Sequence, residues 1–116
     1  MPRPLIRARE RTKLLCNGLL IASGVDCDLP PAVKLFTPDG ACTWLLVEVD
    51  PTDPDRAWGL CDLGLGYPEL GYVSLSELAS IRGRLGLPVE QDRHFKAERP
   101  LSFYVGEARA AGRIVT

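Results

Sequence analysis

The sequence predicts a single α+β domain built around a mostly antiparallel sheet of four or five strands. Short segments with strand-like alternation follow one another between residues 32 and 73, joined by short polar connections as in an antiparallel meander. Segments with helical spacing precede this region, follow it directly and recur well beyond it. With 116 residues, 46% hydrophobic and 25% charged, the chain has the size and composition of one ordinary globular domain. This order of helices and strands indicates the α+β class.

Residues 1–11 are predicted to form a flexible N-terminal tail, and residues 12–116 to form the domain. Pro2 and Pro4 disfavour an early helix, because proline has no backbone N–H to donate. No apolar run approaches the roughly 20 residues that a membrane helix needs. We therefore expect no membrane association and a cytoplasmic location.

A first helix is predicted from Lys13 to about Ala22, with Thr12 as its N-cap. Helical spacing would bury three leucines of this segment: Leu14, Leu15 and Leu19. Gly18 lies in the helix interior, where glycine is expected to cost about 1 kcal/mol relative to alanine.

Five segments have the pattern of β-strands, of which the last is short or merely extended: residues 32–36, 42–50, 56–63, 70–73 and 89–95. Between the first two, Pro38, Asp39 and Gly40 favour a turn, through a preset φ, local backbone bonding and tolerance of positive φ. In the second strand, a period of two places Thr43, Leu45, Val47 and Val49 on one face and Cys42, Trp44, Leu46 and Glu48 on the other. Both faces are mostly apolar at first, so this strand is predicted to be central.

A short capped helix is predicted directly after the fourth strand. The Ser74 hydroxyl would accept the N–H of Glu77, and the Glu77 carboxylate would accept the N–H of Ser74, as in a capping box. Gly83 is predicted to end this helix after Arg82 in its last turn, with three apolar residues on one side: Leu75, Leu78 and Ile81.

A C-terminal helix is predicted with Ser102 as its cap and Gly112 at its end. Four residues follow the i, i+3, i+4, i+7 stripe: Leu101, Tyr104, Val105 and Ala108. This spacing predicts that one side of the helix packs against the sheet.

The four cysteines do not have the spacing of a metal site: Cys16, Cys27, Cys42 and Cys61. They contain no Cys-x-x-Cys pair, and the only histidine, His94, lies far along the chain. Free cysteines in apolar or strand-like surroundings behave as small hydrophobic residues. No metal ion and no cofactor is predicted.

The net charge of −1 is unevenly distributed. Residues 1–15 hold five basic groups and one acidic group (+4), residues 37–81 one basic and eight acidic (−7), and residues 82–116 seven basic and four acidic (+3). An acidic middle argues against a dedicated DNA-binding domain, which usually carries a strong basic excess. It allows a basic protein partner at the acidic part, or weak phosphate contact by the basic ends.

Several short sequence motifs occur together in a fixed order: Lys34–Gly40, Thr43–Trp44, Gly59–Cys61, Glu69–Leu78, and Arg82–Pro88 followed by Glu90, Asp92 and Phe95. Over roughly residues 12–113 they resemble a bacterial family catalogued as a domain of unknown function. Its members are short proteins, often encoded on plasmids, integrative conjugative elements and phages; the family pattern has Phe at Trp58 and Val73. The resemblance implies a mobile-element setting, where small accessory proteins commonly manage DNA transfer or blunt host defences. It implies no catalytic residues.

Two kinds of catalytic chemistry have candidate residues in the sequence. His94 could activate Cys61 or Ser74 as a nucleophile, but neither candidate lies beside an oxyanion-loop signature. A small metal-dependent hydrolase is a second alternative, in which strand carboxylates would hold the metal: Glu48, Asp50 and Asp62. His94 has charged neighbours, as a surface histidine would, and the three carboxylates can mark a solvated strand end. An enzyme is therefore less favoured, and no catalytic residue is assigned.

The sequence therefore predicts a non-enzymatic accessory protein of a mobile genetic element that binds a protein of host defence or DNA processing. The predicted partner-binding residues are Trp44, Glu48, Trp58, Glu69, Tyr72 and Glu77. Direct nucleic-acid binding is the alternative, through the basic residues Arg7, Arg9, Arg11, Lys13, Arg82 and Arg84. The oligomeric state stays open.

Overall fold

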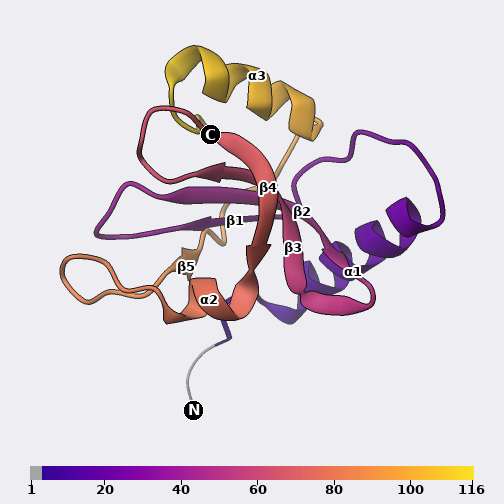
Figure 1. The fold of residues 1–116 in the computed structure, drawn as a ribbon, viewed down its shortest axis with the longest axis horizontal. Coiled ribbons are helices and arrows are strands. Elements are labelled where there is room, and N and C mark those ends of the chain that lie inside the picture. The colour runs from indigo at the N-terminus through magenta and orange to yellow at the C-terminus, as the bar shows by residue number, and fades with distance from the viewer. Residues whose placement is uncertain (1–3) are drawn as a thin grey trace.

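The computed structural model describes residues 4–116 and confirms the α+β fold. A five-stranded antiparallel sheet forms the middle layer (Figure 1). Helices α1 (Ala8–Ala22) and α2 (Leu75–Ser80) pack on one face, and α3 (Leu101–Ala111) packs on the other. Each face carries its own cluster of buried apolar side chains. None of the helices in residues 4–116 is long and apolar enough to cross a bilayer.

The strands occur where the sequence predicted them, with bounds β1 (Val33–Phe36), β2 (Thr43–Asp50), β3 (Asp53–Asp62), β4 (Glu69–Ser74) and β5 (Glu90–Gln91). Their order in the sheet is β4-β3-β2-β1-β5, so β2 is central as expected and β4 lies at an edge. Strand β3 begins three residues earlier than predicted, because Asp50 pairs with Asp53 in a tight hairpin. The Asp50 carboxylate accepts the N–H and the hydroxyl of Thr52, both at 2.8 Å, which fixes this turn.

A β-bulge in β2 changes which side chains share a face. Pairing between β2 and β3 shifts register between Leu46 and Glu48. Val49 therefore packs in the α1 and α2 cluster, not with Leu45 and Val47 as predicted. Glu48 pairs with Trp58 on the α3 face. Strict alternation along β2, without a bulge, had predicted Glu48 on the same face as Trp44.

The first helix begins at Ala8, so the predicted start at Lys13 and the Thr12 cap are wrong. Ile6 is buried ahead of the helix, and only residues 1–3 of the predicted tail lie outside the described chain. The boundary was missed because the N-terminal turn is held by distant groups rather than by a local cap. Of the three leucines predicted to be buried, Leu14 is; the other two, Leu15 and Leu19, are exposed.

The cap of α2 forms only in part as predicted. The Ser74 hydroxyl accepts the N–H of Glu77 at 3.2 Å. Asp55 of β3, and not Glu77, supplies the second group, since its carboxylate accepts the Ser76 N–H at 2.8 Å. The helix ends at Ser80 with Ile81 already extended, so Gly83 does not terminate it.

A distant aspartate also serves α3, where the predicted Ser102 cap is wrong. Pro100 occupies the N-cap position, and Asp28 accepts the Ser102 N–H at 3.2 Å together with the Ser102 hydroxyl. Gly112 ends the helix as predicted, with a left-handed φ of 76°. The four predicted stripe residues are all buried: Leu101, Tyr104, Val105 and Ala108.

The turn at residues 37–40 forms, but its predicted local chemistry is wrong. The Gly40 N–H donates to the Thr37 carbonyl at 3.2 Å, and Gly40 does not have a positive φ. Asp39 bonds no part of the turn. Its carboxylate instead accepts backbone N–H groups of Leu85 and Leu87, nearly fifty residues away.

Candidate functional site

Two hollows lie on either side of α2, and each gathers part of one predicted site. The first, of about 690 Å³, runs beside β4 and is called here the acidic groove. It brings together three predicted partner-binding residues: Trp44, Tyr72 and Glu77. Trp44 is only 2% exposed, so it belongs to the core and offers little surface to a partner.

The other three predicted partner-binding residues lie outside the groove. Trp58 is half-buried in the α3 cluster and pairs with Tyr72 on the neighbouring strand. Glu48 pairs with Trp58 from the opposite side, so Glu48, Trp58 and Tyr72 form one row across three strands. Glu69 opposes Cys61 on the other face of the sheet. The six residues therefore do not form one continuous surface.

Tyr72 is the exposed aromatic of this region, with 57% of its surface accessible. The Arg56 guanidinium carbon lies 3.9 Å from the centre of the Tyr72 ring, in a cation–π contact. Leu70, on the same face of β4, is 41% exposed. The sheet edge thus presents an apolar pair that α3 does not cover.

Asp55 organises the wall of the acidic groove. Its carboxylate accepts hydrogen bonds from the Ser74 hydroxyl at 2.6 Å, and from the Ser76 N–H and hydroxyl at 2.8 and 3.0 Å. These bonds, Ser74 first, lower the pKa of Asp55. The charged lining residues are Asp53, Asp55, Glu77 and Arg56, a net of −2.

Strand β4 is an edge strand whose only charged residue is Glu69, at its start. Its six residues include no lysine, no proline and no bulge in their pairing with β3. Within residues 4–116, no hydrogen bond ties the outward-facing backbone groups of β4 to another segment. Such an edge can accept an added strand.

The second hollow, of about 1070 Å³, lies between the start of α1, the end of α2 and β5, and is called here the basic cleft. It brings Arg7 and Arg82, two of the predicted nucleic-acid residues, into one lining although 75 positions separate them. Arg93 and His94 line it too, and the prediction did not include them. Both lie inside the predicted last strand, residues 89–95, and their only sequence signal was the run of charged residues around them.

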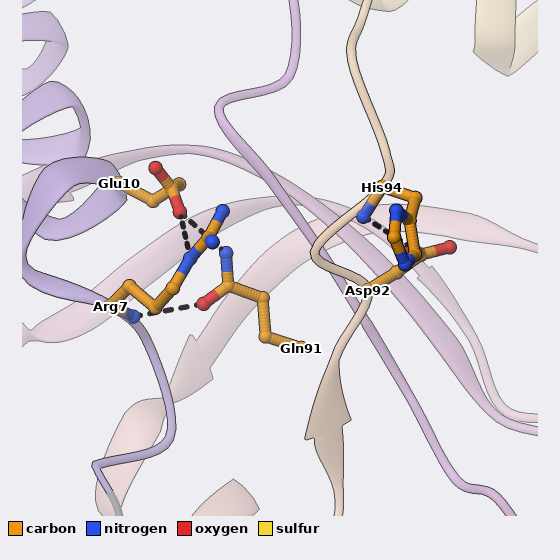
Figure 2. A network of polar contacts seen from close by, with 5 residues as sticks. All are labelled: Arg7, Glu10, Gln91, Asp92 and His94. Atoms are coloured by element: carbon orange, nitrogen blue, oxygen red, sulfur yellow. Dashed lines mark hydrogen bonds and ion pairs between the residues drawn. The ribbon is translucent and has the colours of Figure 1, made fainter.

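A polar network fixes one wall of the basic cleft (Figure 2). Gln91 accepts the Arg7 N–H at 2.8 Å and donates to Glu10 at 2.7 Å, while Arg7 Nε contacts Glu10 at 2.8 Å. Burial opposes ionisation of Glu10, but the bonds from Gln91 and Arg7 outweigh it and lower the Glu10 pKa. This network ties α1 to β5 and uses much of the Arg7 charge.

The remaining basic residues of that prediction lie outside the basic cleft. Arg9, Arg11 and Lys13 are exposed along α1, and Arg84 is exposed on the loop after α2. Arg82 Nη1 donates to the carbonyls of Ala79 and Ile81 at 3.0 and 2.9 Å, which positions its guanidinium at the cleft.

The catalytic alternatives are not assembled by the fold. Thr43 and Asp62 pair at one end of the β2–β3 hairpin and Glu48 lies towards the other, so the expected proximity of Asp62 to Glu48 is wrong. Both Asp62 oxygens serve backbone donors, Gly64 N at 2.8 Å and Ile114 N at 2.9 Å. Across residues 4–116 no three His, Cys, Asp or Glu side chains are grouped to hold a metal.

The nucleophile alternative meets a similar obstacle. Cys61 lies in β3 and is not part of the basic cleft that His94 lines. Burial raises the pKa of the Cys61 thiol to about 11, with the Glu69 charge adding to the effect. A thiol with so high a pKa is almost wholly protonated at neutral pH. Ser74 faces the acidic groove and bonds Asp55 instead.

The described residues thus form a small α+β protein with one hollow on each side of α2. Residues 5–115 match the family described as "Protein of unknown function (DUF2958)", and the chain belongs to this family. No curated protein and no solved structure matches the chain.

Proposed function

We propose that this protein is a non-enzymatic accessory protein of a mobile genetic element, and that it binds a protein of host defence or DNA processing. The open edge of β4 beside the acidic groove carries the binding part of this proposal. The mobile-element part rests on the resemblance of the sequence to proteins encoded on plasmids, conjugative elements and phages.

The edge offers two kinds of contact to a partner. Outward backbone groups of β4 can pair with an extended segment. Tyr72 and Leu70 supply apolar area next to them, and aromatic anchors of this kind carry much of the energy of protein interfaces. Arg56 holds the Tyr72 ring from one side, so less side-chain entropy is lost on binding.

The charge of the groove selects the kind of partner. Its lining carries a net of −2, and the hydrogen bonds that lower the pKa of Asp55 favour its charged form. A segment with basic residues beside apolar ones therefore fits best, because complementary charge speeds association and disfavours acidic competitors.

The test compares two exposed tyrosines by affinity capture from host lysate, with and without nuclease. Tyr72 is 57% exposed at the edge, and Tyr67 is 63% exposed in the preceding loop. We expect wild type and Tyr67→Ala to capture the same nuclease-resistant protein in stoichiometric amount, and Tyr72→Ala to lose it at least tenfold. Equal capture by Tyr72→Ala, or no protein left after nuclease, would contradict the proposal.

A further inference from the structure

The loop after α2 folds into a projecting finger, defined here as residues 82–88. Its base is closed by a β-bridge between Arg82 and Pro88 and by a Gly83 N–H bond to the Leu87 carbonyl at 2.9 Å. At its tip Leu85 is 81% exposed, more than any other large hydrophobic side chain of residues 4–116. The finger lies at the same end of the molecule as β5 and α2 (Figure 1).

Asp39 holds the finger in shape from the β1–β2 turn. Its Oδ2 accepts the N–H groups of Leu85 at 2.7 Å and Leu87 at 3.3 Å, while its Oδ1 is buried with no hydrogen-bond partner in the described chain. Gly83 of the finger lies so close to Asp39 that an added Cβ would be 1.6 Å from Asp39 Oδ1.

The contact between Asp39 and the finger carries a desolvation cost and lies outside the core. A buried carboxylate oxygen without a partner loses hydration that nothing replaces. No finger residue belongs to either buried cluster, since Ile81 and Val89 on its two sides make those contacts. A cost of this kind is expected where a fixed loop conformation serves binding.

The charges around the finger favour an anionic ligand. Arg82 and Arg93 line the basic cleft and Arg84 is exposed on the finger. The other charged side chains nearby form ion pairs within the protein: Arg7 with Glu10, and Asp92 with Lys34 at 3.6 Å. Three arginines then face two carboxylates, Glu90 in the cleft and Asp39 at the finger, which leaves a net of +1.

The basic cleft adds room and apolar walls. Its volume of about 1070 Å³ equals that of a large small-molecule site, enough for one or two nucleotides. Leu5, Phe36 and Pro88 line it beside the arginines. Bases of a single strand can enter such a cleft, whereas those of a duplex stay paired inside the helix.

We infer that the basic cleft and the finger form a binding site for single-stranded nucleic acid. Phosphates contact Arg82, Arg84 and Arg93, an unpaired base enters the cleft, and Leu85 packs against a neighbouring base. Asp39 is a positioning residue for the finger. This site lies across α2 from the acidic groove and is independent of it.

The test measures fluorescence anisotropy of labelled dT20, rU20 and a 20-bp duplex at several salt concentrations. We expect wild type to prefer a single strand, and Arg84→Gln or Arg93→Gln each to reduce the slope of log affinity against log salt by about 0.7. Leu85→Ser should weaken binding about tenfold at unchanged slope, because the apolar contact is lost. Leu65→Ser is the matched control, since Leu65 is 61% exposed in another loop.

Each outcome bears on the inference. No binding of dT20 or rU20 at 50 mM salt would overturn it, as would a duplex bound as tightly as a single strand. Equal affinities for Leu85→Ser and Leu65→Ser would remove the finger from the site. Tyr72→Ala should bind dT20 or rU20 like wild type, so failure of the protein-partner proposal is distinguishable from failure of this one.

Discussion

Replacing Gly18 of α1 by alanine should destabilise the protein, although the sequence alone predicts the opposite. In an isolated helix the change gains about 1 kcal/mol, because alanine is the better helix former. In the folded chain, a Cβ at Gly18 would lie 1.9 Å from the Val49 carbonyl oxygen and 3.1 Å from its carbon. Gly18 is the point where α1 touches the backbone of β2.

The size of the effect follows from how far the helix must move. Ordinary contact begins near 3.4 Å, so relief requires a shift of more than 1 Å between two backbone elements. The shift would strain the 2.8 Å bond from Asn17 Nδ2 to the Val47 carbonyl and loosen the packing of Leu14. Overpacking of this kind costs about 1–3 kcal/mol, and with rigid backbone on both sides we expect the upper end. After the propensity gain, the net loss is about 2 kcal/mol, or ~8 °C in melting temperature.

Urea and thermal unfolding followed by circular dichroism measure this loss. Gly106→Ala in α3 is the matched control, since nothing lies within 4 Å of its added Cβ. It should stabilise the protein by up to about 1 kcal/mol. A Gly18→Ala variant as stable as wild type, with the control behaving as expected, would refute the reasoning from close approach.

Two further predictions concern carboxylates of the sheet. Asp62→Ala should lower stability by about 2–3 kcal/mol in urea unfolding, because the Gly64 and Ile114 N–H groups lose their acceptors; exposed Asp53→Ala should change it by less than about 0.5 kcal/mol. Glu48→Gln should raise the melting temperature at pH 7 by about 2 °C, because burial first and the Asp50 charge second raise the Glu48 pKa. A raised carboxyl pKa means that ionisation costs stability above the folded pKa, so the advantage of Gln should shrink as the pH falls towards 4; a constant difference would contradict this.

Patterns that act over a few residues predicted most of the fold. The alternation of apolar residues predicted all five strands, and the apolar stripe of α3 predicted its buried side. Burial of one face imposes such a period on the sequence, whichever element packs against that face. The α2 cap was half predicted, since the Ser74–Glu77 bond is local. The bulge at Glu48 was not, because an extra residue in β2 is defined only by its pairing with β3.

The candidate sites were less predictable, because they depend on which distant segments meet. Arg7 and Arg82 were chosen for their charge, and only the fold brings them into one cleft with Arg93. Trp44 and Trp58 were chosen as aromatic anchors, and packing buries the first and half-buries the second. Tyr72 keeps its exposure because β4 is at the edge, a property of strand order that alternation does not encode.

The acidic middle of the chain illustrates how the fold changes a functional argument drawn from charge. Of its eight acidic residues, three accept backbone N–H groups of distant segments: Asp39, Asp55 and Asp62. Asp62 is buried and Asp39 is turned towards the finger, so neither adds to an acidic surface. Asp55 both accepts a backbone N–H at the start of α2 and contributes its charge to the acidic groove. The case for a basic partner therefore rests on the few carboxylates around β4 and α2, and not on the charge of the whole segment.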